Sequence, residues 1–266
     1  MRFALSGSLR DNPAHTVVTP KDDRFLIRQD EVHIWHTELL NPEDARQLRP
    51  LLSADELQRA NQFRFPEHRR RFTIARACLR QLLGTYLRVV PQEIRFAYSA
   101  EGKPQLSSEF SQDLSFNVSH SENLAVFSFT NYRKIGVDVE VFRYDVDTEG
   151  IPRRFFSDVE QRALAGLHGQ EKIQGFFNCW TRKEAYVKAV GQGLSLPLRD
   201  FDVSLLPGEP ARILATRPDP QIASHWSIEP FYLNEQCAAA VVVEGRIAAL
   251  QVRQFVPLPV AATEHR

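Results

Sequence analysis

Gly136-Val137-Asp138-Val139-Glu140 is the stretch of sequence on which the predicted fold and the predicted site both depend. Apolar and charged side chains alternate in it, which predicts a strand with both carboxylates on one face. A second stretch, Trp180-Thr181-Arg182-Lys183-Glu184-Ala185-Tyr186-Val187-Lys188, predicts a helix with Glu184 and Lys188 one turn apart. If strand and helix pack together, three carboxylates and one ammonium group converge. Such oxygen ligands suit Mg²⁺ held jointly with a phosphate substrate, and the lysine suits the phosphate itself.

Both pairs of charged residues also have a purely structural interpretation. Asp138 and Glu140 can line the solvent face of a strand, and Glu184 with Lys188 can form a surface ion pair worth roughly 0.2–0.5 kcal/mol. The charged, turn-prone segment 142–150 that follows the strand favours a site, because functional residues often lie where strands end in loops. We expect this segment to be a mobile loop.

The composition predicts a globular protein. The 266 residues are 43% hydrophobic and 25% charged, and the zero net charge argues neither for nor against a nucleic-acid partner. No apolar run reaches the roughly 18 residues of a membrane span, and the N-terminal apolar stretch is too short for a signal peptide. The scattered cysteines Cys78, Cys179 and Cys237 lack metal-ligand spacing and indicate reduced thiols in a cytoplasmic protein.

Hydrophobic periodicity and capping signals predict an α+β fold. Helices are expected to begin at Asn41-Pro42 and at the capping box Ser53-Ala54-Asp55-Glu56. Further helices are expected over residues 66–89, 158–167 and 172–190. Strands are expected near residues 32–36, 94–98, 114–119, 124–130, 135–141, 201–205, 226–233, 238–243 and 247–255.

Helix, long helix and strands follow one another twice along the chain. This order predicts two pseudo-symmetric halves, each a small antiparallel sheet packed with a long helix, over residues 31–133 and 134–266. Residues 1–30 are polar and weakly patterned, and we expect them to form a loose N-terminal extension. No clear sequence repeat accompanies the repeated order of elements.

Two further features favour a phosphate ligand. A predicted strand ends in polar residues in the segment Phe116-Asn117-Val118-Ser119-His120-Ser121. Here Ser119 and His120 can bind a phosphate or simply cap a turn. The segment lacks the G-x-S-x-G motif that would indicate a hydrolase. The guanidinium group of arginine is well suited to bind phosphate oxygens. Residues 59–80 contain seven arginines and a single acidic residue, Glu67. This cluster is either a solvated helix face or an anion site; its arginines are Arg59, Arg64, Arg69, Arg70, Arg71, Arg76 and Arg80.

Together these segments resemble the motif set of the 4′-phosphopantetheinyl transferases. The resemblance lies in the order and spacing of residues 116–121, 136–140 and 180–195, the last reading Trp-Thr-Arg-Lys-Glu-Ala-Tyr-Val-Lys-Ala-Val-Gly-Gln-Gly-Leu-Ser. It covers roughly residues 32–245. The length and motif order resemble the surfactin-synthetase-activating type, which is monomeric with two pseudo-symmetric halves.

The resemblance implies a reaction and a metal. The family transfers 4′-phosphopantetheine from coenzyme A to a serine of an apo acyl or peptidyl carrier protein and releases 3′,5′-ADP. By this resemblance Asp138, Glu140 and Glu184 hold Mg²⁺ together with the pyrophosphate of coenzyme A, and Mn²⁺ is also compatible with oxygen ligands. Either Glu184 or Lys188 can accept the proton of the attacking serine.

The resemblance also implies how coenzyme A is held. Lys188, Lys103, Ser119 and His120 would contact the pyrophosphate. Arg59 and Arg71 would contact the 3′-phosphate. Relatives often have a lysine at the position of Glu56, so this chain would form the 3′-phosphate site differently, from Arg59, Arg70 and Arg71.

The implied partner is a carrier protein, usually an acidic helical bundle that serves fatty acid, polyketide or nonribosomal peptide synthesis. Residues 142–156 offer it charge and aromatic anchors. We expect no nucleic-acid partner and no membrane association. Three other interpretations remain open from sequence: a coenzyme A binder without turnover, a nucleic-acid binder that uses the arginines, and a Mg²⁺-dependent phosphohydrolase.

Overall fold

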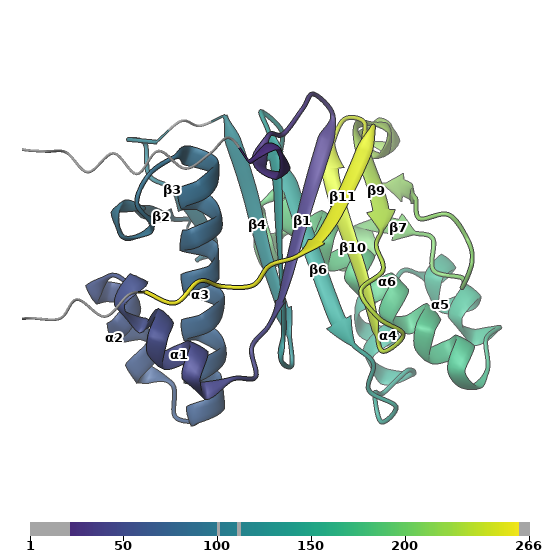
Figure 1. The fold of residues 1–266 in the computed structure, drawn as a ribbon. Helices are drawn as coiled ribbons and strands as arrows, with labels where there is room; N and C mark the ends of the chain where they lie inside the picture. The colour runs from purple at the N-terminus through teal and green to yellow at the C-terminus, as the bar shows by residue number, and fades with distance from the viewer. Residues whose placement is uncertain (1–21, 100–101, 111–112, 261–266) are drawn as a thin grey trace, which may run out of the picture.

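Figure 1 shows two long helices on opposite sides of a central layer of strands. The computed structural model describes residues 22–99, 102–110 and 113–260. The helices are α1 Pro42–Leu48, α2 Ala54–Gln62, α3 Pro66–Leu87, α4 Gly150–Phe155, α5 Asp158–Ala165 and α6 Gly169–Val190. The strands are β1 Glu31–Glu38, β2 Phe96–Tyr98, β3 Pro104–Leu106, β4 Leu114–Ser121, β5 Leu124–Asn131, β6 Ile135–Val141, β7 Phe201–Val203, β8 Ile213–Thr216, β9 Trp226–Pro230, β10 Cys237–Glu244 and β11 Ala249–Gln254.

The strands form two main sheets that pack between the long helices. One sheet has the order β11-β1-β5-β4 and the other β6-β10-β9, while β2-β3 and β7-β8 form two-stranded sheets. One apolar core lies under α3 and a second under α6. A third core, which includes Val32, Val126, Val137 and Val241, lies between the two main sheets. The expected α+β architecture of two helix-covered sheets is thus confirmed.

The two halves share the same buried capping box and ion pair at the start of their second helix. The backbone N–H of Ser53 donates to Glu56 at 2.9 Å, and that carboxylate pairs with Arg80 of α3 at 2.7 Å. In the other half Ser157 donates in the same way to Glu160, which pairs with Lys183 of α6 at 2.8 Å. A capping box therefore ties each short helix to the long helix beside it.

The C-terminal strand departs from the predicted division of the chain. β11 leaves the C-terminal half and pairs in parallel with β1, so Glu31 lies opposite Ala249 and His36 opposite Gln254. The following residues continue across α3, where Leu258 exchanges two hydrogen bonds with the side chain of Gln81. Residues 249–254 therefore belong to the sheet of the N-terminal half, and the larger sheet is not wholly antiparallel.

The residues before β1 correct another expectation. Of the predicted loose extension, residues 1–21 lie outside the described part of the chain. Residues 22–30 are packed rather than loose, because Phe25 stacks on Trp35 with ring centroids 4.9 Å apart and Ile27 is buried in the core under α3.

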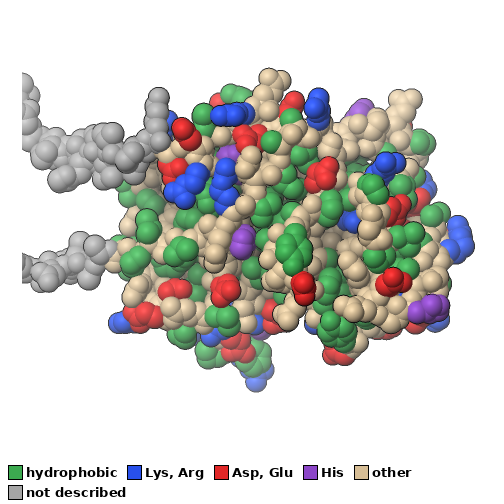
Figure 2. All heavy atoms as spheres, turned by 45° about the vertical axis from the view of Figure 1, so that its right-hand side comes forward, with side chains coloured by type: hydrophobic (Ala, Val, Ile, Leu, Met, Phe, Trp, Pro, Cys, Tyr) green, Lys and Arg blue, Asp and Glu red, His purple; other side chains and the backbone are tan. Residues whose placement is uncertain are grey.

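The structure also differs from the sequence prediction at several short elements, whose sequences carry little periodicity. The expected loop 142–150 ends where α4 begins, at Gly150, and neither this helix nor the short strands β3 and β8 were predicted. No helix in the described part of the chain is both long and apolar enough to cross a membrane. On the face shown in Figure 2, acidic and basic side chains are interspersed.

Candidate active site

The candidate site lies where β4, β6 and α6 meet. Gly136 permits the close approach of α6 to β6, since a Cβ atom at this position would lie 2.1 Å from the carbonyl oxygen of Ala185 and 2.3 Å from the backbone nitrogen of Ala189. On a strand, Asp138 and Glu140 then face the same side as Gly136. The strand–helix packing expected from the sequence is therefore present, and its tightness depends on a residue without a side chain.

Side chains of β4 connect the edges of the two main sheets. Asn117 accepts a hydrogen bond from the backbone N–H of Val137 at 2.9 Å. Two residues further on, Ser119 Oγ donates to Asp138 Oδ1 at 2.8 Å, and Ser121 Oγ donates to Glu140 Oε2 at 2.8 Å. Alternate residues of β4 thus position the two carboxylates of β6.

The ammonium group of Lys188 donates hydrogen bonds to residues of β4 and β6 rather than to Glu184 on its own helix. Its Nζ lies 2.6 Å from Asp138 Oδ1, 3.0 Å from Ser119 Oγ and 3.3 Å from the carbonyl oxygen of Val137. The surface ion pair with Glu184 that the spacing allows is not present among the described residues. The structural interpretation of Glu184 and Lys188 as an ordinary surface pair is therefore wrong.

The carboxylates influence one another electrostatically. Burial, with the nearby Asp138, raises the pKa of Glu184 above its usual value. Burial raises the pKa of Glu140 as well, with a further contribution from Asp138. Three anionic groups in a partly buried site destabilise one another, and a divalent cation would relieve this repulsion.

The same residues fit a divalent cation in chemistry, although they do not form a closed ligand set. No group of three or more His, Cys, Asp or Glu in the described ranges is close enough together to hold a metal ion. However, Asp138 Oδ2 is buried and has no hydrogen-bond partner. A buried carboxylate oxygen without a donor, beside two further carboxylates, is the kind of atom that Mg²⁺ satisfies.

Lys103 brings the N-terminal half to the site. It lies between β2 and β3, and its Nζ donates to the carbonyl oxygen of Lys188 at 2.7 Å. Burial, aided by the positive charge of Lys188, lowers the pKa of Lys103 to about 8. Lys188 thus contacts the carboxylate of Asp138, and Lys103 lies beside Lys188 from a separate element, so the site has two cationic side chains for an anionic ligand.

The other predicted phosphate contacts lie further from these carboxylates. His120 is exposed, and its position on β4 puts it on the face opposite to Ser119. Arg71 pairs with Glu122 at 3.0 Å and donates to Asn123, in the turn that follows β4. Arg59 is exposed, with its guanidinium 5.7 Å from the centre of the Phe72 ring.

Two arginines of the basic cluster do not belong to a solvated face. Arg76 and Arg80 are buried and share the buried carboxylate of Glu56. The glutamate that departs from the family pattern is therefore the counter-charge of two structural arginines. Arg70 donates to the carbonyl oxygen of Leu39, which also gives it a role in the fold.

Some residues of the site were not singled out from the sequence. Asn117 and Ser121 hold β6 through side-chain hydrogen bonds, and the alternation Asn117, Ser119, Ser121 on one strand face was the signal for them. Lys183, inside the helical motif, proves to be buried with Glu160 and donates to the carbonyl oxygens of Leu198 and Phe201. Nothing in its spacing separates this structural lysine from Lys188.

Comparison with known proteins identifies the class to which this geometry belongs. A family model described as the 4′-phosphopantetheinyl transferase superfamily matches residues 134–242, and one described as the N-terminal part of 4′-phosphopantetheinyl transferase matches residues 41–130. The 4′-phosphopantetheinyl transferase HetI of Nostoc sp. is 43% identical over 228 residues, which are 85% of this chain and 93% of that protein. The 4′-phosphopantetheinyl transferase Sfp of Bacillus subtilis is 28% identical over 75% of this chain and 88% of its own.

The chain belongs to the 4′-phosphopantetheinyl transferase superfamily. This confirms the family resemblance and, with it, the expectation of a phosphopantetheinyl-transferring enzyme. A solved structure, the holo-[acyl-carrier-protein] synthase of Thermotoga maritima, is also similar, at a TM-score of 0.35 and 19% identity over 42% of this chain and 63% of its own. Assignment to the surfactin-synthetase-activating type stays a prediction.

Proposed function

We propose that this protein transfers the 4′-phosphopantetheine arm of coenzyme A to a serine of an apo acyl or peptidyl carrier protein and releases 3′,5′-ADP. The observation that carries the proposal is the buried carboxylate of Asp138, which has one oxygen without a hydrogen-bond partner and lies between Lys188, Ser119 and the strand edge. Asp138, Glu140 and Glu184 would hold Mg²⁺, with Mn²⁺ as a possible substitute. When bound, the ion supplies charge neutralisation for the pyrophosphate.

The two lysines would bind and orient the pyrophosphate. Lys188 and Lys103 approach from α6 and from the β2–β3 hairpin, so both can donate to its oxygens while Ser119 offers a hydroxyl. The serine oxygen of the carrier forms a bond to the pantetheine-side phosphorus as the bond from that phosphorus to the leaving 3′,5′-ADP oxygen breaks. His120, Arg59 and Arg71 remain candidates for the outer phosphates, and only Arg59 and His120 among them are exposed.

Of the two possible proton acceptors, Glu184 is the better candidate for the base. The Nζ of Lys188 donates to three oxygens, so it has no free lone pair. Glu184 is a half-buried carboxylate beside Asp138, and its oxygens can accept the proton of the serine. Lys188 then fits the role of a donor to the phosphate oxygens.

Residues 142–156 are our candidate for carrier recognition. Phe142 packs on Phe177 and Phe156 is fully buried, so these rings are not free anchors. Tyr144 is exposed, as are the arginines at 153 and 154 of α4. Reversing the charge of both arginines should weaken use of the carrier and leave the affinity for coenzyme A intact.

The finer assignments follow from the same proposal. We assign the protein to the surfactin-synthetase-activating type because both halves of the site lie on one chain, which also fits a monomer. We place it in the cytoplasm because its three cysteines are free. We expect neither nucleic acid nor membrane among its partners, since two arginines of the basic cluster are buried.

The decisive experiment is intact-protein mass spectrometry of apo carrier proteins incubated with the enzyme, coenzyme A and Mg²⁺. We expect a mass gain of one phosphopantetheine, which is lost with EDTA and in Asp138→Ala. No gain across several acyl and peptidyl carriers would reject the transferase proposal. A gain that survives both EDTA and the substitution would reject the metal site instead.

A further inference from the structure

The hairpin turn between β4 and β5 holds a residue that its backbone conformation does not favour. Ser121 pairs with Leu124, so Glu122 and Asn123 form a two-residue turn. Glu122 has a φ of 49°, in the left-handed region. Glycine, asparagine and aspartate are the usual residues at such a position, because a larger side chain is strained there. A strained residue beside a candidate site indicates a function for its side chain.

The carboxylate of Glu122 occupies one end of a half-buried guanidinium group. Arg71 donates from Nη2 to Glu122 Oε2 at 3.0 Å and from Nε to Asn123 Oδ1 at 3.0 Å. Asn123 is fixed independently, since its carbonyl oxygen accepts a hydrogen bond from the backbone N–H of Leu39 at 2.8 Å. The side chain of Glu122 is 55% exposed and that of Arg71 24%. Asn123 therefore keeps Arg71 in place when Glu122 moves into solvent, and one guanidinium nitrogen becomes free for another anion.

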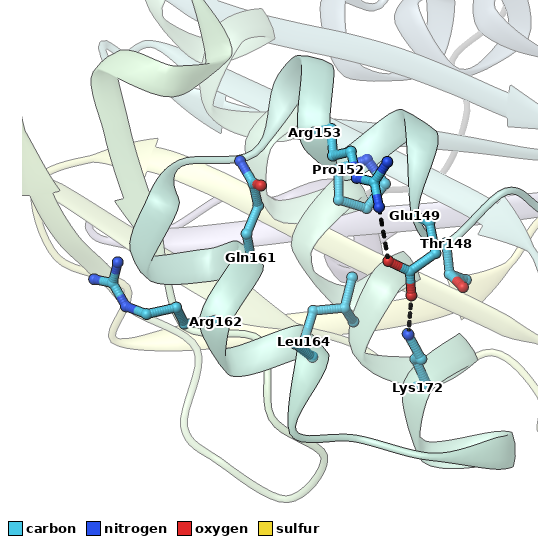
Figure 3. Close-up of a pocket in the computed structure, with 9 residues that line it drawn as sticks. Thr148, Glu149, Pro152, Arg153, Gln161, Arg162, Leu164 and Lys172 are labelled. Atoms are coloured by element: carbon cyan, nitrogen blue, oxygen red, sulfur yellow. Dashed lines mark hydrogen bonds and ion pairs between the residues drawn. The ribbon is translucent and has the colours of Figure 1, made fainter.

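An ordinary surface ion pair of this chain differs in its backbone and its position. In the pocket between α4, α5 and α6, Glu149 pairs with Lys172 and lies 4.0 Å from Arg153 (Figure 3). Glu149 is 62% exposed, and its φ of −111° is negative, as is usual for residues with a side chain. The carboxylates of Glu149 and Glu122 are thus about equally solvated, but that of Glu122 is held on a strained turn next to the candidate active site.

The turn stands beside the carboxylates that would hold the metal. Ser121, directly before Glu122, donates to Glu140 Oε2 at 2.8 Å. Because side chains alternate along β4, Ser121 faces β6 while Phe116 packs in the core under α3, the helix that carries Arg71. A ligand at the carboxylates therefore reaches Arg71 by crossing the end of one strand. Coenzyme A has the matching arrangement, since its pyrophosphate and its 3′-phosphate are attached to the same ribose.

We propose that Glu122 competes with the 3′-phosphate of coenzyme A for Arg71, pairing with this arginine in the free protein and leaving it when the phosphate binds. This inference rests on the proposed transferase function and adds a residue that sets how tightly the ligand is held. A phosphate monoester carries about −1.5 to −2 charges and three acceptor oxygens, so it can replace a single carboxylate. The released 3′,5′-ADP carries the same phosphate, and the return of Glu122 to Arg71 therefore also favours release of this product.

The test compares coenzyme A with 3′-dephospho-coenzyme A by titration calorimetry in the presence of Mg²⁺. Glu122→Gln should lower the Kd of coenzyme A about threefold, because an exposed ion pair no longer has to be broken. The Kd of 3′-dephospho-coenzyme A should stay unchanged, since this ligand has no phosphate to replace the carboxylate. Glu122→Gly suits the left-handed backbone and should give the same two results, which separates the lost charge from any disturbance of the turn.

Two further variants serve as controls. Glu43→Gln removes the same charge from a comparably exposed pair with Arg46 on α1, and it should leave both Kd values unchanged. In an Arg71→Gln background, Glu122→Gln should no longer affect the Kd of coenzyme A, because the two substitutions remove the same ion pair.

The inference is overturned if Glu122→Gln leaves the Kd of coenzyme A unchanged or raises it, since a raised Kd would mean that Glu122 orients Arg71 for the ligand. It is also overturned if both ligands bind more tightly by the same factor, or if the unaltered protein does not distinguish them. An unaltered protein that binds neither ligand would instead overturn the proposed function, so the two failures are distinguishable.

Discussion

Replacing Lys188 by methionine should destabilise the protein in the absence of metal, because it removes the counter-charge of a buried carboxylate. The Asp138 side chain is 5% exposed and that of Lys188 28%. Removing one partner of a fully buried pair costs about 3–5 kcal/mol. Since water reaches Lys188, we expect about 2 kcal/mol for Lys188→Met, which lowers Tm by roughly 4–8 °C in a chain of this size.

The assay is urea unfolding followed by circular dichroism, in EDTA at pH 7.5. A double-mutant cycle with Asp138→Asn should give a coupling energy of about 1–2 kcal/mol, because the pair is lost only once. Lys134→Met, at an exposed lysine before β6, is the control and should leave stability unchanged. The reasoning is refuted if Lys188→Met unfolds at the same urea concentration as the unaltered protein, or if the effects in the cycle simply add.

Three other predictions concern the site. Because the raised pKa of Glu184 means that the folded protein holds its proton more tightly, the contribution of Glu184 to stability in EDTA should be lost as pH rises above about 4.5 and through the raised pKa. Glu184→Gln should therefore be more stable than the unaltered protein at pH 7, and a lower Tm would contradict this. Since only protonated Lys103 attracts the pyrophosphate, the affinity for coenzyme A, measured by calorimetry, should decline as pH rises through about 8. The Lys103→Arg variant should keep its affinity to higher pH, and identical pH profiles of the two proteins would show that Lys103 does not contact the ligand. Gly136→Ala should cost about 3 kcal/mol or more in chemical unfolding because its Cβ meets helix backbone, while Gly166→Ala, whose Cβ comes no closer than 3.5 Å to another residue, should cost far less.

The sequence was most informative where periodicity and chemistry coincide. The long helices were predicted because an apolar stripe runs through them, and the observed α3 and α6 differ from the expectation by a few residues at their ends. The carboxylates of β6 were found because alternation fixes their face once the strand is recognised. The contact between Asp138 and Lys188 could be predicted on the single assumption that the strand packs on the helix.

What escaped prediction depends on contacts between distant segments. Whether Arg76 is an anion-binding residue or a buried structural one is decided by Glu56, which lies on another helix. Similarly, Lys183 and Lys188 look alike in the motif, and only the position of Glu160 separates their roles. The return of β11 to β1 was invisible because a strand pattern does not specify its partner.

The return of β11 makes the molecule resemble a domain-swapped dimer contained in one chain. In such dimers each copy lends an element to the other, whereas here only one half lends a strand, β11, to the sheet of the other. Here residues 249–254 cover the edge of β1, so a chain cut at the middle would leave that edge open to aggregation. The sheet of the N-terminal half therefore depends on the C-terminal strand, and loss of residues 249–254 would first destabilise that sheet.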